Sequence, residues 1–122
     1  MPSLNVNLVI LLSILCSSSA QIFLKLGMNR FAGENTGPLG VILEVAFNPF
    51  IILGVCLHLL ALATWLYVLK HVDVSYAYPF ISLGFVFVLL IGFFFMNENV
   101  NLYRLLGTLV IMLGIVLITR SV

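Results

Sequence analysis

Four long apolar stretches dominate this chain and constrain its fold more than any other feature. They cover roughly residues 4–26, 50–69, 75–96 and 102–119. A helix needs about 20 mainly apolar residues to cross the hydrocarbon core of a bilayer. Of the 122 residues, 63% are hydrophobic and only 7% are charged, whereas a soluble domain carries about 25% charged residues. The sequence therefore predicts an all-α membrane protein in which residues 1–122 form a single four-helix transmembrane domain.

The connections between these stretches are short, except after the first. Residues 70–74 and 97–101 leave room only for turns, so we expect consecutive helices to be antiparallel neighbours in a compact up-down bundle. Residues 39–47 are apolar but too short to span, and they are expected to form an interfacial helix or the early part of the second span. No Lys or Arg precedes Lys25, so the first stretch lacks the basic start of a signal peptide and is expected to be retained.

Charge is sparse and almost evenly distributed. Five basic and four acidic residues cannot form the clustered basic surface that nucleic acids require, so no nucleic-acid partner is expected. One side of the membrane would carry Lys70 and Arg120, and the other Lys25, Arg30 and Arg104. This difference is too small for the positive-inside rule to fix an orientation. Two interpretations stay open: a weakly biased single orientation, and dual topology, in which an antiparallel dimer builds an inverted repeat.

Polar residues recur at every fourth position of the first stretch, as Ser13, Ser17, Gln21 and Lys25. A step of four residues advances about 400° around a helix, so these side chains form one slowly drifting stripe. Because polar groups are poorly satisfied in lipid, the stripe is expected to face other helices or a wet cavity. Ser13 and Ser17 suit interhelical hydrogen bonds. Gln21 and Lys25 suit contact with a substrate, and Lys25 also suits snorkelling to the membrane surface.

The second and third stretches hold further candidate substrate contacts. His58 is an ionisable residue inside an apolar helix, a position that indicates function, although a neutral imidazole also suits a helix contact. Trp65, near the end of the same stretch, is typical of aromatic residues at the membrane interface. Tyr76 and Tyr78 precede a proline and suit either the edge of a partly wet cavity or an interfacial anchor. Ser82 follows them and is expected to keep the backbone there accessible.

The last turn and the last stretch complete the set of candidates. Glu98 and Arg104 flank the turn and serve either helix-end electrostatics or substrate binding, as a gating ion pair or a headgroup contact. Gly107 and Gly114 lie seven residues apart on one face of the last stretch. Small residues allow helices to approach closely, so these two glycines indicate a dimer contact.

No catalytic constellation is present. The chain has no nucleophile elbow, phosphate-cradling glycine loop or paired carboxylates, so no enzyme activity and no cofactor are expected. Cys16 and Cys56 lie within apolar runs and are expected to be packing residues rather than a disulfide or metal ligands.

Four segments carry a resemblance to a known family: QIFLK (21–25), NPFIILG (48–54), WLYVLKHVDVSYAYPFISLGFV (65–86) and NENVNLYRLLGTLVIMLGIVLI (97–118). They resemble the small multidrug resistance proteins of the drug/metabolite transporter superfamily. The similarity extends over nearly the whole chain and is strongest in the "AYP", "SLG" and "NE" motifs. Within that family the chain is most similar to the flippase subunits for aminoarabinose-linked undecaprenyl phosphate. This resemblance implies a multi-pass protein of the bacterial inner membrane, surrounded by membrane lipids, that forms a homodimer or a heterodimer with a similar small membrane protein.

One departure separates the branches of this family. Its drug exporters bind protons and cationic substrates with a glutamate eight residues before the motif lysine, and that position is Ser17 here. Residues 1–31 contain no Asp or Glu. The resemblance therefore implies a flippase for a lipid-linked sugar phosphate, whose phosphate would pass Lys25 while its polyprenyl tail stays in the bilayer. Two other functions stay open: a proton-coupled exporter of cationic drugs or small metabolites that uses His58 or Glu44, and a non-transporting partner subunit.

Overall fold

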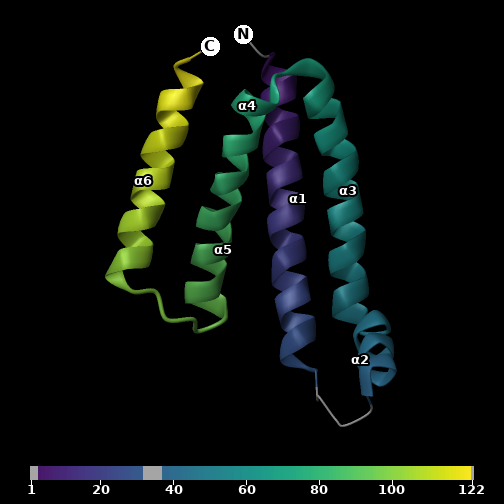
Figure 1. Ribbon diagram of the computed structural model, residues 1–122. Coiled ribbons are helices and arrows are strands. Elements are labelled where there is room, and N and C mark those ends of the chain that lie inside the picture. The colour runs from purple at the N-terminus through teal and green to yellow at the C-terminus, as the bar shows by residue number, and fades with distance from the viewer. Residues whose placement is uncertain (1–2, 32–36, 122) are drawn as a thin grey trace.

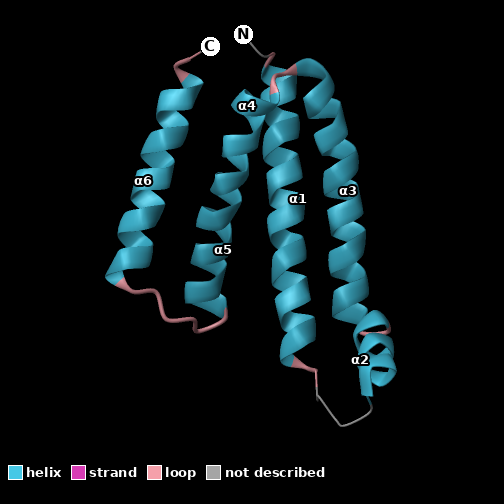
Figure 2. Ribbon diagram, viewed as in Figure 1, coloured by secondary structure: helices cyan, strands magenta, loops and turns pink. Residues whose placement is uncertain are grey.

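The computed structural model describes residues 3–31 and 37–121, and most of these residues are helical (Figures 1 and 2). Four segments in this part of the chain are long and apolar enough to cross a membrane, which confirms the predicted all-α membrane fold. The helices are α1 (Leu4–Asn29), α2 (Gly37–Ala46), α3 (Pro49–His71), α4 (Val74–Ala77), the 3-10 helix η1 (Tyr78–Ile81), α5 (Ser82–Phe95) and α6 (Leu102–Thr119).

The side chain of Asn48 fixes where α3 begins. Asn48 Oδ1 accepts a hydrogen bond from the Phe50 N–H at 3.0 Å, and Pro49 occupies the first turn of α3, where its missing N–H costs nothing. The Asn48 side chain also donates to the Gly27 carbonyl at 3.0 Å, which ties the start of α3 to α1. As a result α2 is a separate short helix before α3 and not its first turns.

The third span, Val74–Phe95, is continuous, as the sequence predicts, but it changes helix type near its start. Pro79 lies in the first turn of η1, between α4 and α5. Because proline has no N–H to donate, it interrupts the regular hydrogen-bond ladder. At the other end of this span, Asn97 adopts a positive φ of 52°. This turn brings the N–H groups of Met96 and Glu98 to the Gly92 carbonyl, at 3.2 and 3.0 Å.

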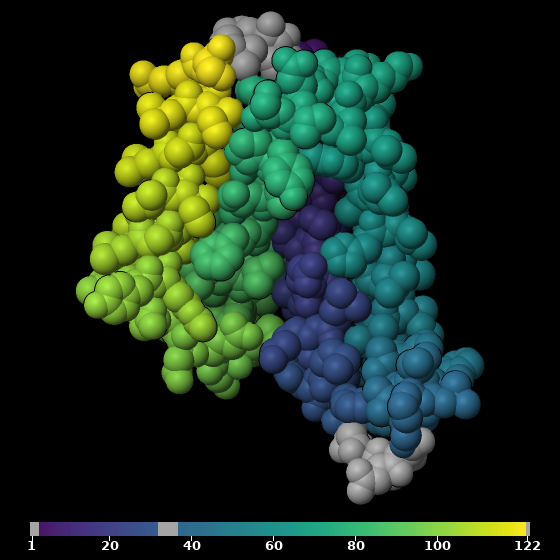
Figure 3. All heavy atoms as spheres, in the orientation of Figure 1, coloured from purple at the N-terminus to yellow at the C-terminus, as the bar shows by residue number. Residues whose placement is uncertain are grey.

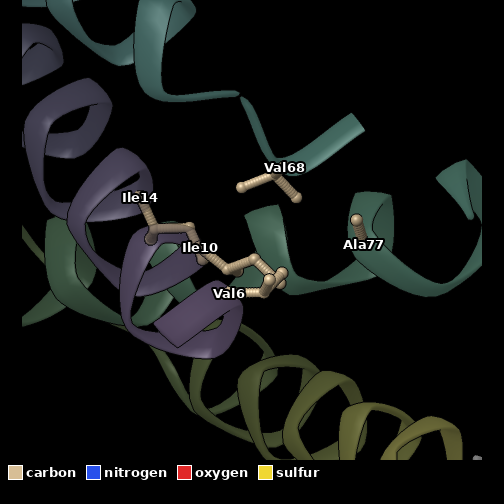
Figure 4. Close-up of a cluster of buried hydrophobic side chains, with 5 residues drawn as sticks. All are labelled: Val6, Ile10, Ile14, Val68 and Ala77. Atoms are coloured by element: carbon tan, nitrogen blue, oxygen red, sulfur yellow. The ribbon is translucent and has the colours of Figure 1, made fainter. Parts of the chain in front are cut away.

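α1 is the central helix of the molecule. It packs along α3 on one side and along α5 on the other, while α6 packs mainly on α5 (Figure 1). Both termini and the α3–α4 turn lie at the same end, as an up-down order requires. The buried core is concentrated at that end, where α1, α3 and α4 bring together the side chains drawn in Figure 4: Val6, Ile10, Ile14, Val68 and Ala77.

Glycines allow the neighbours of α1 to approach it closely. A Cβ on Gly54 of α3 would lie 3.1 Å from the Ala20 carbonyl oxygen, and a Cβ on Gly84 of α5 would lie 2.5 Å from Ser18 Oγ. In consequence α3 and α5 pack mainly on α1 and not on each other. The sequence had led us to expect that consecutive helices would be direct neighbours. Between α3 and α5 the structure instead has a groove with α1 as its floor.

Candidate functional site

A groove of about 700 Å³ lies between α3 and α5. Figure 3 shows the surface hollowed there, with α1 visible between the green α5 and the teal α3. Its lining combines hydroxyl, amide, imidazole and indole groups with apolar side chains. The lining residues are Ser13, Ile14, Ser17, Ser18, Gln21, His58, Ala61, Leu62, Trp65, Ile81, Ser82, Gly84, Phe85 and Val88.

α1 supplies the polar floor of the groove. Ser13 Oγ donates to the Ala61 carbonyl at 3.0 Å in a buried hydrogen bond, so this serine joins α1 to α3. Ser17 Oγ donates to the Ile14 carbonyl of its own helix at 3.1 Å. Both serines and Gln21 line the groove, so this part of the polar stripe faces other helices and a cavity, as the sequence predicts.

α3 supplies one wall, with a regular helical face. His58, Ala61, Leu62 and Trp65 follow the spacing i, i+3, i+4 and i+7, which places them on one side of the helix. The Nε2 atoms of His58 and Gln21 lie 3.4 Å apart, so this histidine and the α1 stripe meet inside the groove.

α5 and η1 supply the opposite wall, which is mainly apolar. Ile81, Phe85 and Val88 line it, with the Ser82 hydroxyl as its polar group. Gly84 brings this wall against the Ser18 side chain of α1. The groove is therefore polar on its α1 and α3 sides and apolar on its α5 side.

The lining residues include no carboxylate, and His58 is the only one of them that can change its charge near neutral pH. The remaining polar groups are hydroxyls, an amide and an indole N–H. Such a surface can donate hydrogen bonds to a phosphate or to sugar hydroxyls. It offers no fixed negative charge to a cation.

Five of the ten predicted substrate contacts meet in this groove: Ser17, Gln21, His58, Trp65 and Ser82. The other five lie outside it. Lys25 is exposed on α1, one turn beyond Gln21. Tyr76 packs against the buried core, with its ring 5.2 Å from that of Phe80. Tyr78 is 62% exposed at the start of η1.

Glu98 lies in the α5–α6 connection and Arg104 in the first turn of α6, both away from the groove lining. The Arg104 guanidinium donates to the Asn99 carbonyl at 2.9 Å, which holds it on its own connection. The Glu98 carboxylate lies against Gly92, where an added Cβ would come within 2.6 Å of its Oε2. Both side chains are exposed and remain accessible to a headgroup outside the groove.

The two α6 glycines for which the sequence predicts a dimer contact face open space within this chain. A Cβ added at Gly107 or at Gly114 would meet nothing within 4 Å. Only Thr108 and Ile115 of α6 are buried. Cys16 is half-buried, Cys56 is exposed, and both are free thiols.

Sequence reasoning did not single out most of the apolar lining. Ala61 and Leu62 could have been found from the helical spacing that starts at His58. No comparable signal marked Ile81, Phe85 and Val88, because nearly every side chain of α5 is apolar and lipid-facing positions look the same as groove-facing ones.

Comparisons with known proteins bear on this groove. The model of the EamA-like transporter family matches residues 4–120. A probable 4-amino-4-deoxy-L-arabinose-phosphoundecaprenol flippase subunit ArnF, from Photorhabdus laumondii, is 32% identical over 117 residues, which are 90% of this chain and 93% of that protein. A probable 4-amino-4-deoxy-L-arabinose-phosphoundecaprenol flippase subunit ArnE, from an Enterobacter species, is 43% identical over 58 residues, 48% of this chain and 54% of that protein.

The ArnE subunit of Pseudomonas paraeruginosa is likewise 43% identical, over 62 residues that are 51% of this chain and 54% of that protein. This chain thus aligns with about half the length of these ArnE subunits. No solved structure matches. The relatives are named as probable flippase subunits, and the resemblance drawn from the sequence segments is confirmed. With its family model matched over residues 4–120, this chain belongs to the EamA-like transporter family.

Proposed function

We propose that this chain is a subunit of a flippase that moves a polyprenyl-phosphate-linked sugar across the bacterial inner membrane. The lipid named for its relatives, 4-amino-4-deoxy-L-arabinose-phosphoundecaprenol, is the proposed substrate. The observation that carries the proposal is the unequal lining of the groove, polar along α1 and α3 and apolar along α5. A lipid with a sugar phosphate head and a hydrocarbon tail is likewise polar in one part and apolar in the other.

The polar floor lowers the cost of moving a phosphate through the membrane. Taking an unpaired ion out of water costs several kcal/mol or more. Donors at Ser17, Gln21 and His58 follow one another across α1 and α3, so the phosphate and the sugar hydroxyls can exchange one partner for the next. The tail meanwhile stays in lipid, beside the exposed side chains of Leu62 and Phe85 at the rim.

Lys25 is proposed to receive the phosphate at one end of this path. It lies one turn beyond Gln21 on α1, is exposed, and carries a positive charge that the groove lining lacks. Arg104, in the first turn of α6, donates to the α5–α6 connection and is proposed to contact the headgroup at the membrane surface. Tyr78, exposed at the start of η1, is proposed to do the same near the opposite end.

A second subunit is proposed to pack on α6. Its glycines Gly107 and Gly114 border open space in this chain, and small residues let a partner helix approach. The relatives are themselves named as subunits. A homodimer and a heterodimer with a similar small membrane protein both fit, and the near-even distribution of Lys and Arg supports an antiparallel pair.

Labelling of the C-terminus from each side of the membrane tests the antiparallel arrangement. Labelling from one side only, without a partner inserted in the opposite sense, would contradict the antiparallel pair.

Reconstitution into proteoliposomes tests the proposed function. The chain, alone and with the other subunit of its flippase, is expected to move a fluorescent undecaprenyl-phosphate-linked arabinose from one leaflet to the other. Proton-coupled uptake of tetraphenylphosphonium by the same vesicles would instead identify a cation exporter. In that case, loss of uptake in His58→Ala or Glu44→Ala would name the coupling residue. Lipid transport that proceeds equally well without this chain would make it a non-transporting subunit.

A further inference from the structure

His58 is placed where a change of charge would matter most for the proposed substrate. It lines the groove beside Gln21, and every other lining residue keeps its charge near neutral pH. The titratable and charged side chains on the helices packed around the groove are not among its lining residues. They are Cys16 and Lys25 on α1, Glu44 on α2, Cys56, Tyr67, Lys70 and His71 on α3, Tyr76 on α4 and Tyr78 on η1; residues 82–95 of α5 include none.

The contact with Gln21 bears on which ring nitrogen of His58 carries the proton. With the Gln21 amide as it is placed, its nitrogen donates to His58 Nε2 across their 3.4 Å separation, and the ring proton then lies on Nδ1. When His58 takes up a second proton, both ring nitrogens become donors. Gln21 must then turn its amide to present Oε1 to the ring, and its NH₂ group is released toward a ligand. Protonation therefore adds a positive charge and a free amide donor at the same place.

The groove needs this charge if a phosphate is to enter it. The lining residues of α1, α3, η1 and α5 include no Lys or Arg, and an ion without a partner is costly in a medium of low polarity. An imidazolium at His58 would form a neutral pair with the phosphate; the amino group of the proposed sugar, itself cationic near neutral pH, is not part of that pair. The absence of a lining carboxylate means that no internal group competes for the imidazolium.

We propose that His58 takes up a proton together with the phosphate of the lipid, so that one proton and one phosphate occupy the groove as a neutral pair. This inference rests on the proposed flippase function. The proton comes from water on the side where the headgroup enters and binds the Nε2 lone pair. It returns to water when the headgroup leaves, and no bond of the lipid is made or broken. Gln21 is a positioning residue for the imidazole.

Trp65 provides the readout. It is the single tryptophan of the chain, it lines the same groove, and it lies two turns along the same face of α3 as His58. The probe is farnesyl-phosphoryl-L-arabinose, a phosphodiester whose own charge stays constant between about pH 5.5 and 8, the range in which imidazoles change charge. In detergent micelles, its binding is measured by the change in tryptophan fluorescence, and the proton taken up on binding is measured with a pH dye in weak buffer.

The wild-type chain is expected to bind the probe more weakly as the pH rises, with a loss of affinity that approaches tenfold per pH unit, the limit for one linked proton. Binding is expected to take up nearly one proton at pH values where His58 is neutral in the free chain, and less as the pH is lowered and the free chain itself becomes protonated. His58→Gln keeps a polar side chain of similar reach and is expected to lose both the pH dependence and the proton uptake. His58→Lys supplies a charge directly and is expected to bind with weaker pH dependence than the wild type.

His71→Gln is the matched control, because His71 is the other histidine of the chain and lies at the end of α3, with Nδ1 2.8 Å from the Tyr67 carbonyl oxygen. It is expected to keep the wild-type pH dependence. Wild-type binding that does not change with pH, or pH dependence that survives in His58→Gln, would overturn the role of His58 and leave the flippase proposal standing. Failure of the wild type to bind the probe at any pH would overturn both.

Discussion

Replacing Gly84 by alanine is expected to force α5 away from α1. A Cβ at this position would lie 2.5 Å from Ser18 Oγ, which is 0.9 Å closer than the 3.4 Å at which ordinary van der Waals contact begins. Ser18 is only 3% exposed, so its hydroxyl has little free space into which to move. Either the helices separate or Ser18 adopts another rotamer, and both change the wall of the groove.

The expected cost is about 1–3 kcal/mol of stability, the usual range for adding a methyl group to a packed site. The geometry also predicts a rescue. Once Ser18 is replaced by alanine, the nearest neighbours of the new Cβ are Ile14 Cγ2 at 3.5 Å and the residue 18 Cβ at 3.8 Å, which are ordinary contacts. The double variant Gly84→Ala with Ser18→Ala is therefore expected to recover most of the loss, with a coupling energy of about 1 kcal/mol or more.

Equilibrium unfolding by SDS in mixed micelles, followed by the fluorescence of Trp65, measures these free energies. Gly107→Ala is the matched control when the chain is monomeric in the micelles, because its Cβ would meet nothing within 4 Å in this chain; it then reports the change in helix propensity alone, which favours alanine by up to about 1 kcal/mol. A Gly84→Ala variant within about 0.5 kcal/mol of this control would refute the reasoning, since that is the usual effect of a neutral surface change. A loss that persists when Ser18 is also alanine would refute it as well.

Three further changes test the groove and its supports. Lys25→Ala is expected to abolish lipid transport in proteoliposomes with insertion unchanged, and Lys25→Arg to keep part of it, because arginine retains the charge but not the donor geometry; full activity of the alanine variant would make Lys25 a snorkelling anchor. Ser17→Glu is expected to slow transport of the anionic headgroup by like-charge repulsion, and an unchanged rate would place the headgroup path elsewhere. Asn48→Ala removes the hydrogen bonds to Phe50 and Gly27 and is expected to cost about 1–2 kcal/mol in the same SDS titration, whereas a loss under about 0.5 kcal/mol would show that water replaces them.

The spans could be predicted from the sequence because length and apolarity decide them. The last helix, Leu102–Thr119, has the expected bounds, and the first begins at Leu4 as expected but continues to Asn29. Helix ends depend on local hydrogen bonds, such as that between the Arg30 N–H and the Gly27 carbonyl, and apolar patterning does not report these. The change of helix type at Pro79 follows from one missing N–H, yet nothing in the pattern of residues 75–96 fixed how far along the span it would extend.

The position of the groove could be predicted only in part, for a physical reason. The floor was visible as the stripe of Ser17 and Gln21, because polar residues stand out in an apolar helix. The wall formed by α5 could not be predicted. Lipid and this side of the groove are both apolar, so the side chains of Phe85 and Val88 would suit either environment. What opens the groove is the close approach of Gly84 to Ser18 and of Gly54 to Ala20, which draws α5 and α3 onto α1 and leaves the space between them. Such distances follow from the pairing of particular small residues across helices, and a single sequence records the residues but not the pairs.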